Sequence, residues 1–348
     1  METSTPVEPL SLFKVLSDSK RVITSQPGLF RALSFLFILP LSIADVVYPI
    51  LIQSLLPGTV SKGFLNPSGF GPQQGEDDKV NPFLIKTLLL ALAYAVFTLV
   101  FSNFAVISIT YSVIHGFSGQ PVKLKSAIKS IATSFFPLLG TTLLIQTIIL
   151  PIAILLGVVF ALLINGARLL GFRVEFSLPY FLLFCVVVLV PLLLIVILVQ
   201  VNWALFSVVV VAESTWGLKS LKRSASLIKG RRRLALSLFL YFFFCSGVFT
   251  WIINSHLPVT NLNGGSASDR EWKYFSLVTR ILVNSAFQTL VVLYELIANA
   301  VLYVYCTKAS ADHGDKEYAG EYYISLPVDD NNDKAPRVVS VACSKLEV

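Results

Sequence analysis

Long apolar runs alternate with shorter polar connections along this chain. Crossing the hydrocarbon core of a bilayer takes about 20 consecutive apolar residues in a helix. Six runs reach that length, with predicted bounds Phe30–Leu55, Pro82–Tyr111, Phe135–Ile164, Leu178–Val211, Leu234–Ile253 and Phe275–Cys306. The pattern predicts an all-α fold, a polytopic membrane bundle of six transmembrane helices.

Polar segments at the two ends divide the chain into three predicted parts. Residues 1–28 form an N-terminal segment with an amphipathic helix, and residues 29–310 form the six-span domain. Residues 311–348 are polar and partly acidic, and they contain few of the apolar residues that build a core. Such a composition is typical of a disordered tail.

Lysine and arginine predict the orientation. The N-terminal segment with Arg31 just after it, and the second and fourth connections, hold 14 of these residues, and the alternate connections hold 6. Lys86 and Arg280, just inside the ends of spans two and six, raise the smaller number to 8. Cytoplasmic loops carry the excess of Lys and Arg in membrane proteins. We therefore expect both termini in the cytosol, in an ER-derived endomembrane or the plasma membrane.

Composition supports a membrane protein and argues against nucleic-acid binding. The mean hydropathy is +0.75, and 14% of residues are charged, whereas soluble domains carry about 25%. The net charge of +7 comes from cations beside the apolar runs. They are not interleaved with stacking aromatic residues, as in a single-strand-binding surface.

Two basic segments on the predicted cytosolic side align without gaps. They are Leu124–Ser130 and Leu218–Ser224, and Phe13–Ser19 matches them more weakly. Helical periodicity predicts that one face is apolar and that lysines and serines take the opposite face. The predicted apolar faces consist of Leu124, Ala127, Ile128 and Ile131, and of Leu218, Leu221, Ala225 and Ile228.

Two interpretations of this alignment remain open. In the first, the chain has a three-fold internal repeat, each unit being an interfacial helix followed by two spans. In the second, the similarity is convergent, because any cytosolic juxtamembrane helix is basic and amphipathic.

An interfacial helix of this kind buries its apolar face among headgroups while its cations meet anionic lipid. The candidate residues for binding anionic headgroups, or a protein partner at the cytosolic face, are Lys125, Lys129, Lys219, Lys222, Arg223, Lys229, Arg231, Arg232 and Arg233. Glu213 lies just ahead of the second helix, where its charge is expected to favour the helix N-terminus. The alternative is that these cations only set the topology.

The residues around this helix also resemble a known motif. Its elements are Val211-Ala-Glu213 through Gly217, Leu218-Lys219, Arg223-Ser224, Leu227 and Lys229-Gly230. They resemble a motif in multi-helix membrane proteins that include the membrane domain attached to bacterial glycerophosphodiester phosphodiesterases. The layout is also similar to a plant family of six-span membrane proteins without an assigned activity. The resemblance implies an architecture and no activity, because the motif carries no catalytic residue and the chain has no room for the phosphodiesterase barrel.

Polar residues inside the predicted spans are the other candidates. They are Asp45, Gln200, Asn202, Glu295 and Asn299. Charged groups inside a membrane are expensive and mark ion or substrate paths by default. In one reading, Asp45 and Glu295 line a polar cavity. In the other, each acid is protonated, paired or hydrogen-bonded, and it holds helices together.

Familiar catalytic patterns are missing from the sequence. It has no Gly-rich phosphate loop, His-Glu-x-x-His or nucleophile elbow, and its three histidines fall in separate segments. We therefore expect no enzyme, no catalytic residue, no cofactor and no metal. The predicted function is a multi-pass membrane protein whose basic helices bind anionic lipid or a partner in membrane organisation or trafficking. The alternative is a transporter or lipid-moving protein with Asp45 and Glu295 in its path.

Overall fold

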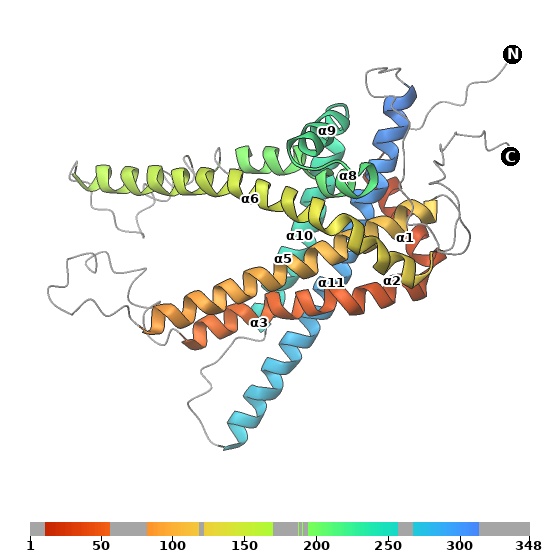
Figure 1. Ribbon diagram of the computed structural model, residues 1–348. Helices are drawn as coiled ribbons and strands as arrows, with labels where there is room; N and C mark the ends of the chain where they lie inside the picture. The colour runs from red at the N-terminus through yellow and green to blue at the C-terminus, as the bar shows by residue number, and fades with distance from the viewer. Residues whose placement is uncertain are drawn as a thin grey trace, which may run out of the picture. The chain divides into compact units, whose positions relative to one another are not determined.

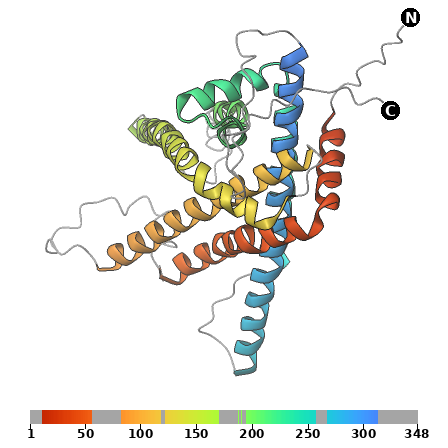
Figure 2. The same ribbon diagram turned by 45° about the vertical axis from the view of Figure 1, so that its right-hand side comes forward.

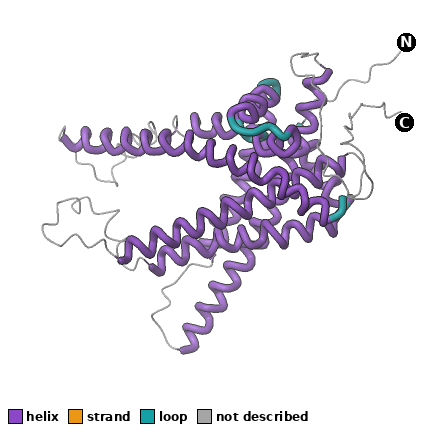
Figure 3. Tube along the Cα trace, viewed as in Figure 1, coloured by secondary structure: helices purple, strands orange, loops and turns teal. Residues whose placement is uncertain are grey.

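A computed structural model describes residues 11–55, 82–117, 122–169, 187, 190, 194–256 and 267–312. Helices dominate this part of the chain, and it contains no strand (Figure 3). The principal helices, labelled in Figure 1 where there is room, are α1 Leu12–Ser25, α2 Pro27–Leu33, α3 Leu39–Leu55, α5 Pro82–Phe117, α6 Leu124–Leu169, α8 Phe206–Glu213, α9 Leu218–Ile228, α10 Arg232–His256 and α11 Ala267–Asp312. A π-helical stretch, η1 Ser34–Ile38, joins α2 to α3.

Among the residues that the structure describes, six helical stretches are long and apolar enough to cross a membrane. They are Pro27–Ile52, Ile85–Phe117, Leu124–Val159, Leu194–Glu213, Arg232–Ile253 and Tyr274–Lys308. The prediction of an all-α, six-span membrane protein is therefore confirmed. The predicted start of span four at Leu178 and the predicted tail beyond Asp312 lie outside the described residues.

The prediction of a separate interfacial helix at Leu124–Ser130 is wrong. The segment that begins at Leu124 is the first part of α6, which continues for 46 residues through Pro137 and Pro151. Residues 124–135 contain neither glycine nor proline, so nothing in the local sequence ends the helix before the span. By contrast, α9 follows Gly217 and ends just before Lys229-Gly230, and it is a short helix of its own (Figure 2).

The chain divides into two compact units. The first unit contains α1, residues 107–117 of α5, α6, α8, α9, the beginning of α10 through Leu240 and α11 from Ile297 onward. All three basic segments that the sequence assigns to one side of the membrane thus belong to this unit. Its core includes Ile109, Leu138, Leu205, Ile228 and Leu302, each almost fully buried.

The second unit contains the first span, residues 82–106 of α5, α10 from Tyr241 and α11 up to Leu296. Aromatic side chains pack its helices together. Phe249 stacks on Phe287 with ring centroids 3.6 Å apart, and Phe37 meets Phe104 edge-on at 5.7 Å. Such pairs stabilise by about 0.5–1.5 kcal/mol beyond the apolar area that they bury.

Candidate functional site

The connection between α8 and α9 is a tight corner of four residues in the first unit. Ser214 has φ of 51° and Gly217 has φ of 70° with ψ of −144°. Backbone angles of this kind are open to glycine because it has no Cβ. The corner therefore turns the chain out of span four and directly into α9.

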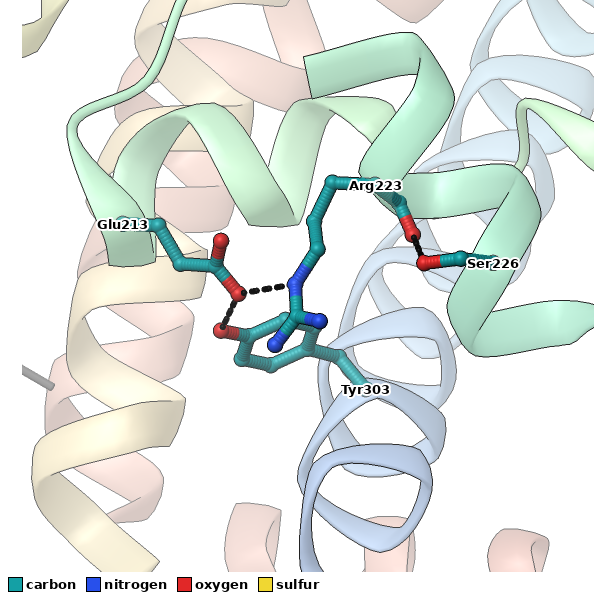
Figure 4. Close-up of polar contacts among 4 residues, drawn as sticks. All are labelled: Glu213, Arg223, Ser226 and Tyr303. Atoms are coloured by element: carbon teal, nitrogen blue, oxygen red, sulfur yellow. Dashed lines mark hydrogen bonds and ion pairs between the residues drawn. The ribbon is translucent and has the colours of Figure 1, made fainter. Parts of the chain in front are cut away.

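An ion pair holds α9 in one orientation. Arg223 Nε of α9 donates to Glu213 Oε1 at the end of α8 over 3.2 Å. The hydroxyl of Tyr303 in α11 donates to the same oxygen over 3.0 Å (Figure 4). The side chains of Arg223 and Glu213 are only 12% and 14% exposed. Hydrogen bonds to charged groups are roughly twice as strong as neutral ones, so this contact fixes which face of α9 points away from the helices.

The prediction that Glu213 caps α9 is wrong. The N-cap of α9 is Gly217, which has no side chain that could cap the helix. Glu213 belongs to α8, and its carboxylate is occupied by Arg223 and Tyr303. The spacing of ten residues between the acid and Arg223 gave no helical signal, because the two lie on different helices.

A threonine of α6 holds the corner at its other end. The backbone N–H of Gly217 donates to Thr141 Oγ1 over 2.9 Å. The same hydroxyl donates to the carbonyl of Pro137 over 2.8 Å. Thr141 is fully buried, so its two bonds satisfy polar groups that water does not reach.

Span four is broken inside its apolar run, and α9 covers the break. Residues 203–205 form a turn, and the N–H of Phe206 donates to Trp203 O over 3.0 Å, so the ladder that an unbroken helix would extend past Asn202 is interrupted. The hydroxyl of Ser224 donates to the carbonyl of Asn202 over 3.0 Å. Irregular backbone at membrane depth is tolerated where protein satisfies it. The break at 203–205 contains no proline.

The predicted division of α9 into an apolar face and a polar face is only partly right. Its buried residues are Ser220, Leu221, Ser224, Leu227 and Ile228. Ser220 and Ser224 thus lie inside, whereas Leu218 is 56% exposed. A serine side chain is small enough for close helix packing, and its hydroxyl is satisfied by a nearby carbonyl, as that of Ser220 is by Gly217 O over 2.8 Å.

Most of the candidate cations of this region are exposed. Lys219, Lys222, Lys229, Arg232 and Arg233 are exposed, and we call these five residues the cationic α9 surface. Arg223 is committed to Glu213, and Arg231 is half-buried. Exposed Trp216 and Leu218 lie beside the surface in sequence. Lys125 and Lys129 are exposed in the first turns of α6.

The three aligned basic segments share a burial pattern. At their first position, Phe13, Leu124 and Leu218 are 80%, 38% and 56% exposed. At their seventh position, Ser19, Ser130 and Ser224 are 0%, 4% and 0% exposed. An internal repeat produces this pattern, and so does convergence on one amphipathic register, because segments in the same register bury the same positions.

The intramembrane polar residues are divided between the two units. Asp45 and Glu295 belong to the second unit, whereas Gln200, Asn202 and Asn299 belong to the first. The carboxylate of Asp45 accepts a hydrogen bond from Tyr94 over 2.8 Å. The ring of Tyr94 is stacked on that of Tyr48 at 3.9 Å. Glu295 is half-buried.

No metal centre is found in the part of the chain that the structure describes, where no group of three or more His, Cys, Asp or Glu side chains is placed to hold an ion. Cys306 is buried, as expected for an ordinary interior thiol.

Comparison with known proteins places the chain in a family. The profile of a family described as a domain of unknown function (DUF8558) matches residues 2–322. The chain belongs to the DUF8558 family. The match includes all six spans and the α8–α9 corner. No curated protein and no solved structure matches the chain. The comparisons give no link to the plant family or to the phosphodiesterase membrane domain, so that resemblance stays a prediction from the motif residues.

Proposed function

We propose that this multi-pass membrane protein is not an enzyme and binds anionic lipid headgroups through the cationic α9 surface. In this proposal, binding supports membrane organisation or trafficking at the cytosolic face. The observation that carries it is that the cations in and beside α9 lie in two different environments. Arg223 is tied to Glu213, while Lys219, Lys222 and Lys229 of the same region stay exposed.

Cations on a helix that is held in one orientation bind a headgroup at a lower entropic cost than cations on a mobile segment, because less backbone freedom is lost on binding. Each Lys or Arg near an anionic leaflet contributes about 1 kcal/mol, so the five residues together supply several. Exposed Trp216 and Leu218 add apolar contacts at the depth where aromatic residues favour the membrane boundary.

The test compares the thermal unfolding of three purified proteins in mixed micelles of phosphatidylcholine with increasing phosphatidylserine. One is the wild type, and one has the five surface cations changed to glutamine. In the third, each Lys becomes Arg and each Arg becomes Lys, so that the charge is kept. Arg223 is left unchanged in all three, because it holds the corner together. A ligand at a hundred times its Kd stabilises by about 2.7 kcal/mol.

We expect phosphatidylserine to raise the Tm of the wild type and of the charge-preserving variant, and to leave that of the glutamine variant unchanged. An equal rise in all three proteins contradicts the proposal and reduces the cations to a topology signal. If phosphatidylserine stabilises none of the three proteins, binding of a protein partner explains the surface better than binding of lipid.

Asp45 favours a second candidate, a transporter or lipid-moving protein. Its carboxylate is exposed within a membrane span and bonded to Tyr94, and such residues mark polar paths in membranes. In reconstituted vesicles, Asp45→Asn and Glu295→Gln are expected to abolish movement of a fluorescent lipid between leaflets. Unchanged flux in both variants removes these two roles.

A further inference from the structure

We propose that Ser226 is a phosphorylation site, and that a phosphate there releases the cationic α9 surface from anionic lipid. This inference rests on the proposed function, because it assigns the regulation of the same surface. It begins from two serines of α9 that have opposite environments although they lie two residues apart.

Only one of the two is available to a modifying enzyme. Ser224 is fully buried, and its hydroxyl is held by the carbonyl of Asn202. Ser226 is exposed, and its hydroxyl donates to Arg223 O of its own helix over 2.8 Å (Figure 4). The bond of Ser226 is local and is easily exchanged for one to water or to an incoming group.

The surroundings of Ser226 are cationic. Lys222 precedes it by four residues and Lys229 follows it by three, and residues at these spacings are neighbours on a helix surface. Both lysines are exposed. A phosphate between them carries a charge of about −1.5 to −2 at neutral pH. It therefore cancels up to two cations, and its oxygens compete with lipid phosphates for the lysine ammonium groups.

The position along the helix strengthens the effect. Ser226 lies in the last turn of α9, which ends at Ile228. Negative charge is unfavourable at a helix C-terminus because of the helix dipole. Helix ends also fray readily, which gives an enzyme access to the backbone around Ser226.

The aligned basic segments differ at this position. Arg21 and Ala132 stand where α9 has Ser226. Among the three segments, therefore, α9 alone has a hydroxyl here. The buried seventh position is serine in all three, whereas the ninth position is exposed in all three and is serine in α9 alone.

The modification is a phosphoryl transfer from a nucleoside triphosphate by a protein kinase that accepts cations near its target. The hydroxyl oxygen of Ser226 attacks the γ-phosphorus and forms a new O–P bond. The bond between that phosphorus and the β,γ-bridging oxygen breaks, and the nucleoside diphosphate leaves with the electron pair. The hydroxyl proton goes to a base of the kinase.

The first arm of the test locates the phosphate. The full chain is produced in cells that contain serine/threonine kinases, and its peptides are mapped by mass spectrometry beside the Ser226→Ala variant. We expect phosphate on Ser226, none on Ser224, and none on this helix in the variant. A chain without phosphate on Ser226, after it has also been incubated with ATP and a kinase selective for basic sequences, overturns the inference.

The second arm measures the consequence. Full-length protein with phosphoserine installed at position 226 is compared with the unmodified chain for binding to the phosphatidylserine micelles. Loss of one and a half to two cationic charges predicts binding about tenfold to thirtyfold weaker. Ser226→Ala is expected to bind like the wild type.

The two proposals fail in different ways. Phosphatidylserine binding that stays within twofold after phosphorylation overturns the inference and leaves the proposed function standing. No phosphatidylserine dependence in the unmodified chain overturns the proposed function and this inference with it.

Discussion

At the scale of single residues, the chemistry of the corner depends on what each charged group is paired with. Arg223 and Lys222 are adjacent cations in the sequence, yet Arg223 pairs with Glu213 while Lys222 is exposed. The sequence alone does not distinguish these two members of the basic cluster. Their environments differ, because a largely buried cation needs a counter-charge whereas an exposed one is solvated.

Replacing Arg223 by alanine is therefore expected to destabilise the protein by about 3 kcal/mol, because Glu213 is left without its counter-charge. Lys222→Ala is the matched control and is expected to change the free energy of unfolding by less than about 0.5 kcal/mol. Equilibrium unfolding in mixed micelles, followed by circular dichroism, measures both.

A double variant tests the same ion pair more directly. Glu213→Gln combined with Arg223→Ala removes both charges and is expected to be more stable than Arg223→Ala alone, since no unpaired charge remains. Equal losses in Arg223→Ala and Lys222→Ala contradict the assignment of the ion pair.

At the scale of elements, α9 is the cover of a broken span as well as a basic helix. Residues 203–205 interrupt span four, and Ser224 satisfies the carbonyl of Asn202. The same helix presents Lys219 and Lys222 on its open side. The proposed lipid-binding face and the contact that satisfies the break in span four thus belong to a single short helix.

Ser224→Ala is expected to cost about 1–2 kcal/mol, because the carbonyl of Asn202 loses its donor in a buried place. Ser226→Ala, two residues later and exposed, is expected to cost less than about 0.5 kcal/mol. Amide hydrogen exchange around Phe206 reports the local effect. Faster exchange there in both variants, or in neither, argues against a specific role for Ser224.

At the scale of the whole molecule, the first unit gathers α1, the beginning of α6 and α9. The distribution of Lys and Arg assigns the same three segments to one side of the membrane. The first unit also contains the whole of α6, which crosses the membrane, so membership of the unit is no measure of sidedness. The side that each basic segment faces is a prediction from charge.

Cysteine labelling tests the sidedness. In a chain whose own cysteines are replaced by serine, Ser17→Cys, Lys125→Cys and Ser226→Cys are expected to react with a membrane-impermeant maleimide from one side of sealed vesicles. Ser255→Cys, at the end of span five, is expected to react from the other side. Labelling of Ser17→Cys and Ser226→Cys from opposite sides contradicts the predicted topology.

Apolar run length by itself determined six membrane-spanning helices, because a helix in lipid must carry about 20 apolar residues whatever its neighbours are. The local sequence also marked α9, since Gly217 and Lys229-Gly230 bracket it. These properties depend on neighbouring residues only, and for that reason they can be read along the chain.

Tertiary structure alone decided which polar groups meet. The bond of Tyr303 to Glu213 joins residues 90 positions apart, and the burial of Ser224 depends on the broken ladder at Asn202. Periodicity placed Ser220 and Ser224 outside because it ranks serine as polar. Ser220 is buried and bonds to the nearby carbonyl of Gly217, whereas Ser224 is buried against span four, which offers it the carbonyl of Asn202. The contact of Ser224 joins two separate elements, and no single segment of the sequence contains it.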